Sequence, residues 1–244
     1  MSSESLPVAP GPDDFRALAR SSPWLFTTVH FTHRGPRDAG GETGDTAQAW
    51  LDRDARRVTV RAADGVHVEQ GVPDSTSGMD AGPSRHDADL VRRTDGLVTH
   101  RPDNWHFLYG DPIWRDYRWT AMLDPVELSS GVQIQEVTTG MLRGRSTWSA
   151  ICIPMVGEGA DWEGGYDPRC GCCPLLDSAA SRLLEYGTAD AAMHFGDVPQ
   201  TYLVRLDVQT AIVVDVTAMD GWGGIVLTNE VHAVDLPLAP PRLA

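Results

Sequence analysis

The residues with the clearest chemical potential are three cysteines within four positions. Cys170, Cys172 and Cys173 lie in the segment Asp-Pro-Arg-Cys-Gly-Cys-Cys-Pro at 167–174. Thiolates bind soft metals, and Cys170 and Cys173 form a C-x-x-C pair of the kind that cycles between dithiol and disulfide. Together with Cys152 the loop would supply a four-thiolate site for zinc or copper(I), although adjacent Cys172 and Cys173 are not expected to face one tetrahedral ion together. A metal site, a redox pair and a structural loop with small buried thiols therefore all remain open.

The second candidate site is a run of aromatic residues between positions 102 and 123. Ligand pockets have mostly apolar walls with a few polar anchors, so this run predicts a site for a hydrophobic or aromatic small molecule. A packed aromatic core is the equally weighted alternative. The predicted ligand-binding residues are Trp105, Tyr109, Trp114, Tyr117 and Trp119.

Groups able to move protons are scattered, and no hydrolase, zinc-protease or phosphate-loop motif accompanies them. A cofactor-independent cyclase or isomerase of specialised metabolism, using the same cavity, is the alternative function. Its catalytic candidates are His30, His106, Asp111 and Tyr117. His30 and His33 differ by three positions and should lie on opposite faces of one strand, with His30 on the concave side alongside Thr28 and Thr32.

Composition excludes several classes of function. The chain has 244 residues, a formal net charge of −14 and no lysine. This charge repels phosphate backbones, so no nucleic-acid partner is expected, and the absence of lysine excludes pyridoxal phosphate and Walker-type phosphate loops. No organic cofactor is therefore expected. We find no apolar run of membrane-spanning length and no secretory signal in the first ten residues, which predicts a cytoplasmic protein without membrane insertion. Oligomeric state is not specified by the sequence.

Hydrophobic periodicity predicts short strands with few helices. A first helix should be capped by Asp13 and end at Pro23, and a second should cover 175–186 and stop at Gly187. Asp124-Pro125 should open a short helical turn. The expected strands are 24–33, 47–52, 56–62, 66–70, 90–94, 97–101, 132–141, 146–154, 201–207, 212–219 and 224–234. We expect a single domain, 1–244, with a flexible leader (1–11), a mobile loop (72–89) and a proline-rich tail (236–244).

This order of elements predicts an α+β fold: a strongly curved antiparallel sheet of about ten strands, forming an open half-barrel, with a few short helices on its concave side. The chain resembles the lipoprotein-carrier superfamily of LolA-type carriers and the related sigma-factor regulatory and mycobacterial lipid-binding lipoproteins. The resemblance lies in a helix leading into Leu25-Phe26-Thr27-Thr28-Val29-His30-Phe31-Thr32, in the strand at 49–53, in 66–71 and in the late hairpin at 202–210. It implies binding of a hydrophobic, lipid-like molecule by a variant without a signal peptide.

Overall fold

The computed structural model describes residues 9–35, 46–71, 85–86, 89–102, 111–159, 163–194 and 197–241. The helices are α1 (Pro12–Ser21), α2 (Tyr117–Leu123) and α3 (Ala179–His194), with 3₁₀ turns η1 (Ser22–Trp24) and η3 (Val126–Ser129). The strands are β1 (Thr28–Arg34), β2 (Thr46–Asp52), β3 (Arg57–Ala62), β4 (Gly65–Gln70), β5 (Val91–Arg92), β6 (Val98–His100), β7 (Val132–Leu142), β8 (Arg145–Pro154), β9 (Tyr202–Asp207), β10 (Val213–Ala218) and β11 (Gly224–Val234).

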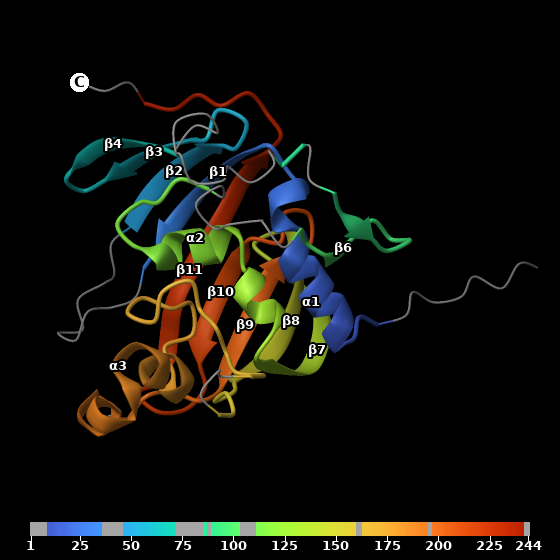
Figure 1. Cartoon of the computed structure of the whole chain (residues 1–244). Coiled ribbons are helices and arrows are strands. Elements are labelled where there is room, and N and C mark those ends of the chain that lie inside the picture. Colours follow the sequence, from blue (N-terminus) through green and yellow to red (C-terminus); the bar gives the residue numbers. More distant parts are fainter. Residues whose placement is uncertain are drawn as a thin grey trace, which may run out of the picture.

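Nine of these strands form one antiparallel sheet in the order β4-β3-β2-β1-β11-β10-β9-β8-β7 (Figure 1). The sheet consists of two meanders, one from each half of the chain, which are joined where β1 pairs with the last strand, β11. A register shift between His30 and Phe31 marks a bulge in this central pair. The short pair β5–β6 forms a separate hairpin beside α1. The predicted α+β class with an open, curved antiparallel sheet is confirmed.

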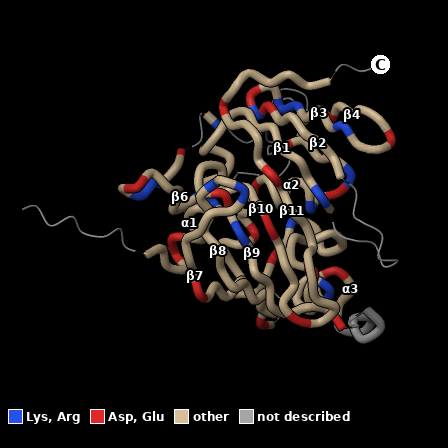
Figure 2. The backbone as a smooth tube through the Cα atoms, turned by 180° about the vertical axis from the view of Figure 1, so that it is seen from behind, with Lys and Arg blue, Asp and Glu red and all other residues tan. Residues whose placement is uncertain are grey.

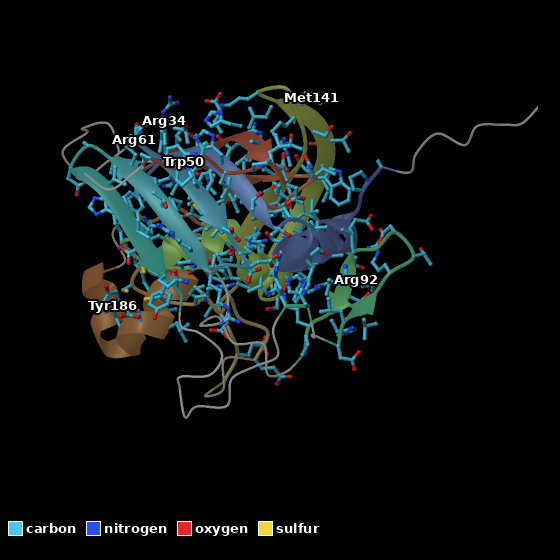
Figure 3. The ribbon with its side chains drawn as sticks, turned by 90° about the horizontal axis from the view of Figure 1, so that it is seen from above. Arg34, Trp50, Arg61, Arg92, Met141 and Tyr186 are labelled. Atoms are coloured by element: carbon cyan, nitrogen blue, oxygen red, sulfur yellow. The ribbon has the colours of Figure 1, made fainter. Side chains whose placement is uncertain are left out.

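The sheet bends around α1 and α2, which lie on its inner side (Figure 3). Along β1, Val29 and Phe31 are fully buried, and Phe31 contacts Trp119 of α2 at a ring distance of 5.5 Å. Val58 and Val60 of β3 are fully buried as well, as their alternation with charged neighbours predicted. The hydrophobic core therefore lies between the inner face of the sheet and the helical layer.

Several element boundaries differ from the sequence-based prediction. Gly11, not Asp13, precedes the first turn of α1, and its N–H donates to the carboxylate of Asp14 at 2.7 Å. The first strand begins at Thr28 because Trp24 belongs to the 3₁₀ turn that follows α1. Helix α2 was not predicted at all, since the aromatic residues around it hid its short helical spacing.

Helix α3 begins four residues later than expected, at Ala179. Ser178 and Ser181 bond each other's backbone N–H groups through their hydroxyls, at 3.3 and 2.9 Å, which is a reciprocal cap. The predicted stop at Gly187 corresponds to a non-helical residue there (φ 69°, ψ 174°), after which the backbone resumes a helical path to His194. Gly187 therefore correctly predicted a break in the helix, but the prediction missed that the helix resumes after this residue.

Parts of the predicted leader and tail, and most of the loop at 72–89, lie outside the described residues. Within that loop, Arg85 is well anchored, because its guanidinium group donates to the carbonyls of Pro23 and Phe26 at 3.0 and 2.7 Å. Among the described helices, none is long and apolar enough to cross a membrane. Acidic positions are spread along the described chain and interspersed with arginines (Figure 2).

Candidate ligand cavity and cysteine cluster

A cavity of about 200 Å³ lies between the end of β1 and helix α2. Two tryptophans form its apolar walls: the rings of Trp114 and Trp119 meet edge to face with centroids 5.0 Å apart. The lining residues are His33, Gly35, Trp114, Arg115, Asp116, Arg118, Trp119 and Met122. The cavity thus combines aromatic walls with charged groups, as a small-molecule site requires.

His33 is a neutral hydrogen-bond acceptor in this cavity. Asn229 donates through Nδ2 to the carbonyl of Val213 at 2.7 Å, so its Oδ1 faces Nδ1 of His33 at 2.8 Å. Nδ1 must therefore carry the proton, which leaves Nε2 as an acceptor on the side of Gly35. Desolvation lowers the pKa of His33 to about 4, although the hydrogen bond that its Nδ1–H donates to Asn229 opposes this shift. The imidazole is consequently uncharged at neutral pH.

The charged residues of the cavity carry a positive balance. Arg115 lies over the ring of Trp114 with its guanidinium carbon 4.4 Å from the centroid. Asp116 caps α2 by accepting the N–H of Arg118 at 3.0 Å, and the Nε–H of Arg118 donates to the carbonyl of Pro174. Two arginines and one aspartate leave one net positive charge, because His33 is neutral. The indole N–H of Trp119 is buried without an acceptor among the described residues.

The predicted aromatic site is only partly assembled. Trp114 and Trp119 line the cavity, yet both are also core residues with exposed fractions of 5% and 3%. Tyr117 is the first residue of α2 and is half-buried, outside the cavity lining. Trp105 and Tyr109 lie outside the described residues. The run therefore serves as core and cavity wall at once, and the cavity is smaller than the range of about 300–1,000 Å³ typical of drug-sized ligands.

The expectation that His30 faces the concave side was wrong. His30 lies on the outer face, stacked on Trp50 with centroids 4.6 Å apart and planes 7° apart, and His232 lies 4.9 Å away. Trp50 and Arg61 lie together on this outer face in Figure 3. The predicted placement of His30 and His33 on opposite faces is confirmed, but the residue that reaches the helical side is His33.

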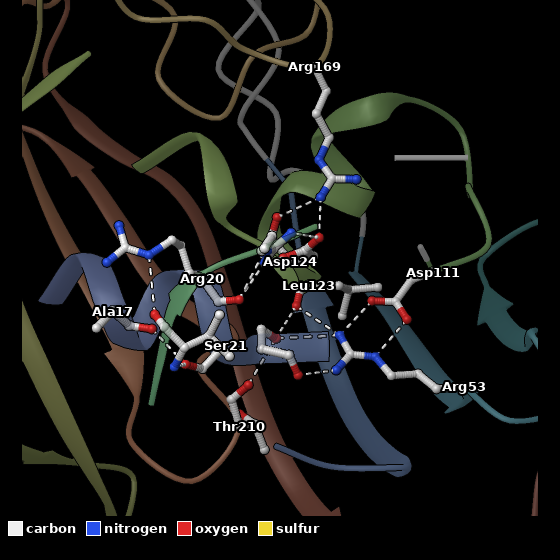
Figure 4. Close-up of polar contacts among 12 residues, drawn as sticks. Ala17, Arg20, Ser21, Arg53, Asp111, Leu123, Asp124, Arg169 and Thr210 are labelled. Carbon is white, nitrogen blue, oxygen red and sulfur yellow. Dashed lines mark hydrogen bonds and ion pairs between the residues drawn. The ribbon is translucent and has the colours of Figure 1, made fainter. Parts of the chain in front are cut away.

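The other described catalytic candidates, Asp111 and Tyr117, do not line the cavity. Asp111 is buried and forms a bidentate ion pair with Arg53, at 2.7 and 2.6 Å (Figure 4). The guanidinium charge of Arg53 balances the negative charge of this carboxylate. His106 lies outside the described residues. Among the described candidates, the structure therefore assembles no acid–base pair at one point.

The three loop thiols do converge. The Sγ atoms of Cys170, Cys172 and Cys173 all lie within 4.8 Å of one another, with Cys170 and Cys172 2.7 Å apart and Cys172 and Cys173 3.7 Å apart. Adjacent Cys172 and Cys173 thus do face the same point, contrary to expectation. The closest pair is C-x-C and not the predicted C-x-x-C. The cluster has the composition of a metal site.

Cys152 does not join the cluster. It is fully buried on β8, where its sulfur lies 3.9 Å from the carbonyl oxygen of Ala150. Burial raises the pKa of its thiol far above the ordinary range. The predicted four-thiolate site that included Cys152 is therefore wrong, because the side chain of Cys152 lies in the hydrophobic core and not at the surface loop.

Buried polar contacts hold the cysteine loop against the α2 region. The guanidinium group of Arg169, directly before Cys170, pairs with the carboxylate of Asp124 (Figure 4). The same carboxylate also binds Arg101. Beyond the cysteines, the N–H of Leu175 donates to the carboxylate of buried Glu127 at 2.9 Å. Because these ion pairs and hydrogen bonds are buried away from solvent, they hold the backbone of the cysteine loop in one position.

The thiols of the loop differ in acidity. Burial opposes ionisation of Cys170, yet hydrogen bonds from Cys172 and Cys173 hold its pKa below the ordinary value. Burial raises the pKa of Cys173 to about 12, while a hydrogen bond from the backbone N–H of Tyr117 opposes this rise. Cys170 is therefore the most readily ionised of the three.

Sequence reasoning missed the residues that define both sites. Asn229 orients His33 from a strand almost two hundred positions later, and no local pattern could reveal this. Arg118 belongs to the cavity and also bonds the loop, which its position on an unpredicted helix concealed. Arg169 lies directly before Cys170 in the sequence, and this adjacency was the signal that could have indicated its role in holding the cysteine loop.

Comparison with known proteins finds similarity at the level of structure only. No protein-family model matches the chain, and the search of curated proteins finds no match to its sequence. The crystal structure of MucB matches with a TM-score of 0.40 and 11% identity, over 94% of this chain and 60% of MucB. The Pseudomonas aeruginosa MucA/MucB complex matches with 0.37 and 10%, over 94% and 58%. LprF from Mycobacterium bovis matches with 0.36 and 12%, over 97% and 99%.

The chain therefore spans less than two thirds of the MucB chains that it matches. All three matches have TM-scores of 0.40 or less and identities of 12% or less, so the resemblance to the half-barrel lipoprotein-carrier superfamily stays a prediction. At such identities and TM-scores they carry no argument about what this chain binds. Any function must come from the geometry of the chain's own residues.

Proposed function

We propose that this protein binds a small hydrophobic molecule with an acidic group, in the cavity between β1 and α2. The observation that carries the proposal is the pairing of aromatic walls, Trp114 and Trp119, with a net positive charge from Arg115 and Arg118. An apolar cavity of about 150 Å³ suffices to hold benzene, so about 200 Å³ accommodates one ring or a short aliphatic chain with a polar group.

The polar groups set the expected chemistry of the ligand. A carboxylate would be drawn to the arginines, and a hydroxyl or N–H group would find its acceptor in Nε2 of His33. The indole N–H of Trp119 would gain a partner from any ligand acceptor that reaches it. The proposed function is therefore binding of an amphipathic small molecule, in line with the hydrophobic ligand that the family resemblance implies.

Titration calorimetry with benzoate, hexanoate and neutral benzamide tests the proposal. We expect benzoate to bind more tightly than benzamide by about 10–100-fold, the value of one hydrogen bond to a charged group. Trp114→Ala should weaken benzoate binding at least about tenfold, because the ring forms a wall of the cavity.

The matched control is Trp222→Ala, which removes a tryptophan that is 48% exposed and lies outside the cavity. It should leave benzoate affinity unchanged. Equal weakening in both variants, or binding of none of the three probes, would show that this cavity is not a ligand site.

A further inference from the structure

Two of the three loop sulfurs already have the spacing of a zinc site. In a tetrahedral zinc site with Zn–S bonds of about 2.3 Å, two sulfurs lie about 3.8 Å apart. Cys172 and Cys173 already have a separation of 3.7 Å. Cys170 and Cys172 are 2.7 Å apart, so one of them has to turn away by about 1 Å to bind the same ion. Cys172 is exposed and Cys170 half-buried, which leaves room for that movement.

The backbone that carries the sulfurs is fixed from both sides. Arg169 and the loop before it are tied to Asp124, and the carbonyl of Pro174 accepts the Nε–H of Arg118 at 2.9 Å. Gly171 packs so tightly on α3 that a Cβ there would come within 2.8 Å of the Cβ of Glu185. Ligands held in place before binding lose little conformational entropy when the metal arrives.

The third thiol distinguishes a metal site from a redox pair. A disulfide uses two sulfurs, whereas here the sulfur of Cys173 also lies within 4.8 Å of the other two. From these contacts we infer that Cys170, Cys172 and Cys173 bind one zinc ion through three thiolates, in a site independent of the proposed ligand cavity. Zinc accepts oxygen as well as sulfur ligands and is almost always four-coordinate, so a fourth position remains.

Solvent and one carboxylate are available for the fourth position. Cys172 is at the surface, so water reaches the cluster. The carboxylate of Glu185 approaches from α3, where its Oε2 lies 2.7 Å from the place that a Cβ on Gly171 would occupy. Three thiolates with an oxygen ligand are a donor set that zinc takes and that hard cations such as magnesium do not.

Metal analysis of the 244-residue chain tests the inference. Protein is reduced, freed of metal, incubated with zinc sulfate, separated from excess zinc and measured for zinc content. We expect one zinc per chain, with alkylation of the three loop thiols by a maleimide slowed when zinc is bound. Cys172→Ser should weaken zinc binding by more than about 100-fold, since loss of an outer-shell partner alone costs about 10–100-fold.

Cys152→Ala is the matched control, because it removes a buried cysteine outside the cluster and should retain one zinc. Circular dichroism verifies the folding of both variants. The assignment is overturned if reduced wild-type protein does not bind stoichiometric zinc, or if Cys172→Ser leaves the zinc content unchanged. Binding of copper(I) in place of zinc also overturns it. Unprotected loop thiols in zinc-loaded wild-type protein also overturn it, independently of either variant.

Discussion

The buried carboxylate of Asp124 is the most informative position to perturb. Its side chain is 1% exposed and pairs with the guanidinium groups of Arg101 and Arg169, which are 8% and 6% exposed. Asp124→Asn retains the size of the side chain and removes its charge. The two arginines would then remain buried with no carboxylate between them, which is costly because a buried charge needs a partner.

The magnitude follows from the burial and the pKa. Burial alone would raise the pKa of Asp124, but Arg101 and Arg169 lower it from 3.8 to about 2. Since each pKa unit is worth about 1.4 kcal/mol, the ionised carboxylate contributes about 2.5 kcal/mol, present above pH 3.8 and lost as the pH falls towards 2. Removing one partner of a buried pair typically costs about 3–5 kcal/mol. We therefore expect Asp124→Asn to lower the free energy of unfolding by about 3–5 kcal/mol at pH 7.

Urea unfolding, followed by tryptophan fluorescence at pH 7 and pH 3, measures this change. Asp13→Asn is the control, because that carboxylate is 95% exposed and its pair with Arg16 should contribute less than about 0.5 kcal/mol. The difference in the free energy of unfolding between wild type and Asp124→Asn should be smaller at pH 3 than at pH 7, because the carboxylate of Asp124 contributes less as the pH falls below 3.8. If the two variants lose similar stability at pH 7, or if the pH dependence is absent, the reasoning is refuted.

Three further outcomes follow from the geometry. The imidazole of His33 should titrate by NMR with a midpoint near pH 4, and a midpoint near 6.5 would contradict its buried, neutral state. The contribution of neutral His33 to the free energy of unfolding should be lost as the pH falls from about 6.5 to about 4, because the unfolded chain binds the proton more readily in that range. Gly131→Ala should destabilise the protein by more than about 3 kcal/mol in thermal unfolding, because the φ of Gly131 is +64° and a Cβ would lie 1.8 Å from the carbonyl oxygen of Gly165. Gly144→Ala, which has open space around the added Cβ, should cost about 1 kcal/mol. Similar losses in the two variants would contradict this reasoning. Thiol counting on the reduced, metal-free protein should find three thiols that react in the native state, with Cys173 the slowest because burial raises its pKa, and four in the denatured state, since Cys152 is fully buried. Four native thiols would show that β8 opens.

Local periodicity explains why much of the sheet was predictable. Val58 and Val60 alternate with charged residues, and the turn at Arg143-Gly144 between β7 and β8 has positive φ at both positions, so these elements follow from neighbouring residues alone. Helix α2 escaped because its seven residues are too short for a clear helical period. Its cap, Asp116, was present in the sequence, but the aromatic residues around it favoured a pocket or core interpretation.

Alternation along β1 shows that His30 and His33 take opposite faces, but it carries no information on which face the helices cover. That choice depends on β1 pairing with β11 and on Trp119 packing against Phe31, contacts between segments far apart in the chain. The sequence by itself determined the strand pattern, the acidic charge and the crowding of three cysteines. Only the tertiary structure decided that His33 and not His30 reaches the cavity, and that Cys152 is excluded from the cluster while Arg169 and Arg118 hold it. Local preferences act over a few residues, whereas both sites are formed by packing between distant ones.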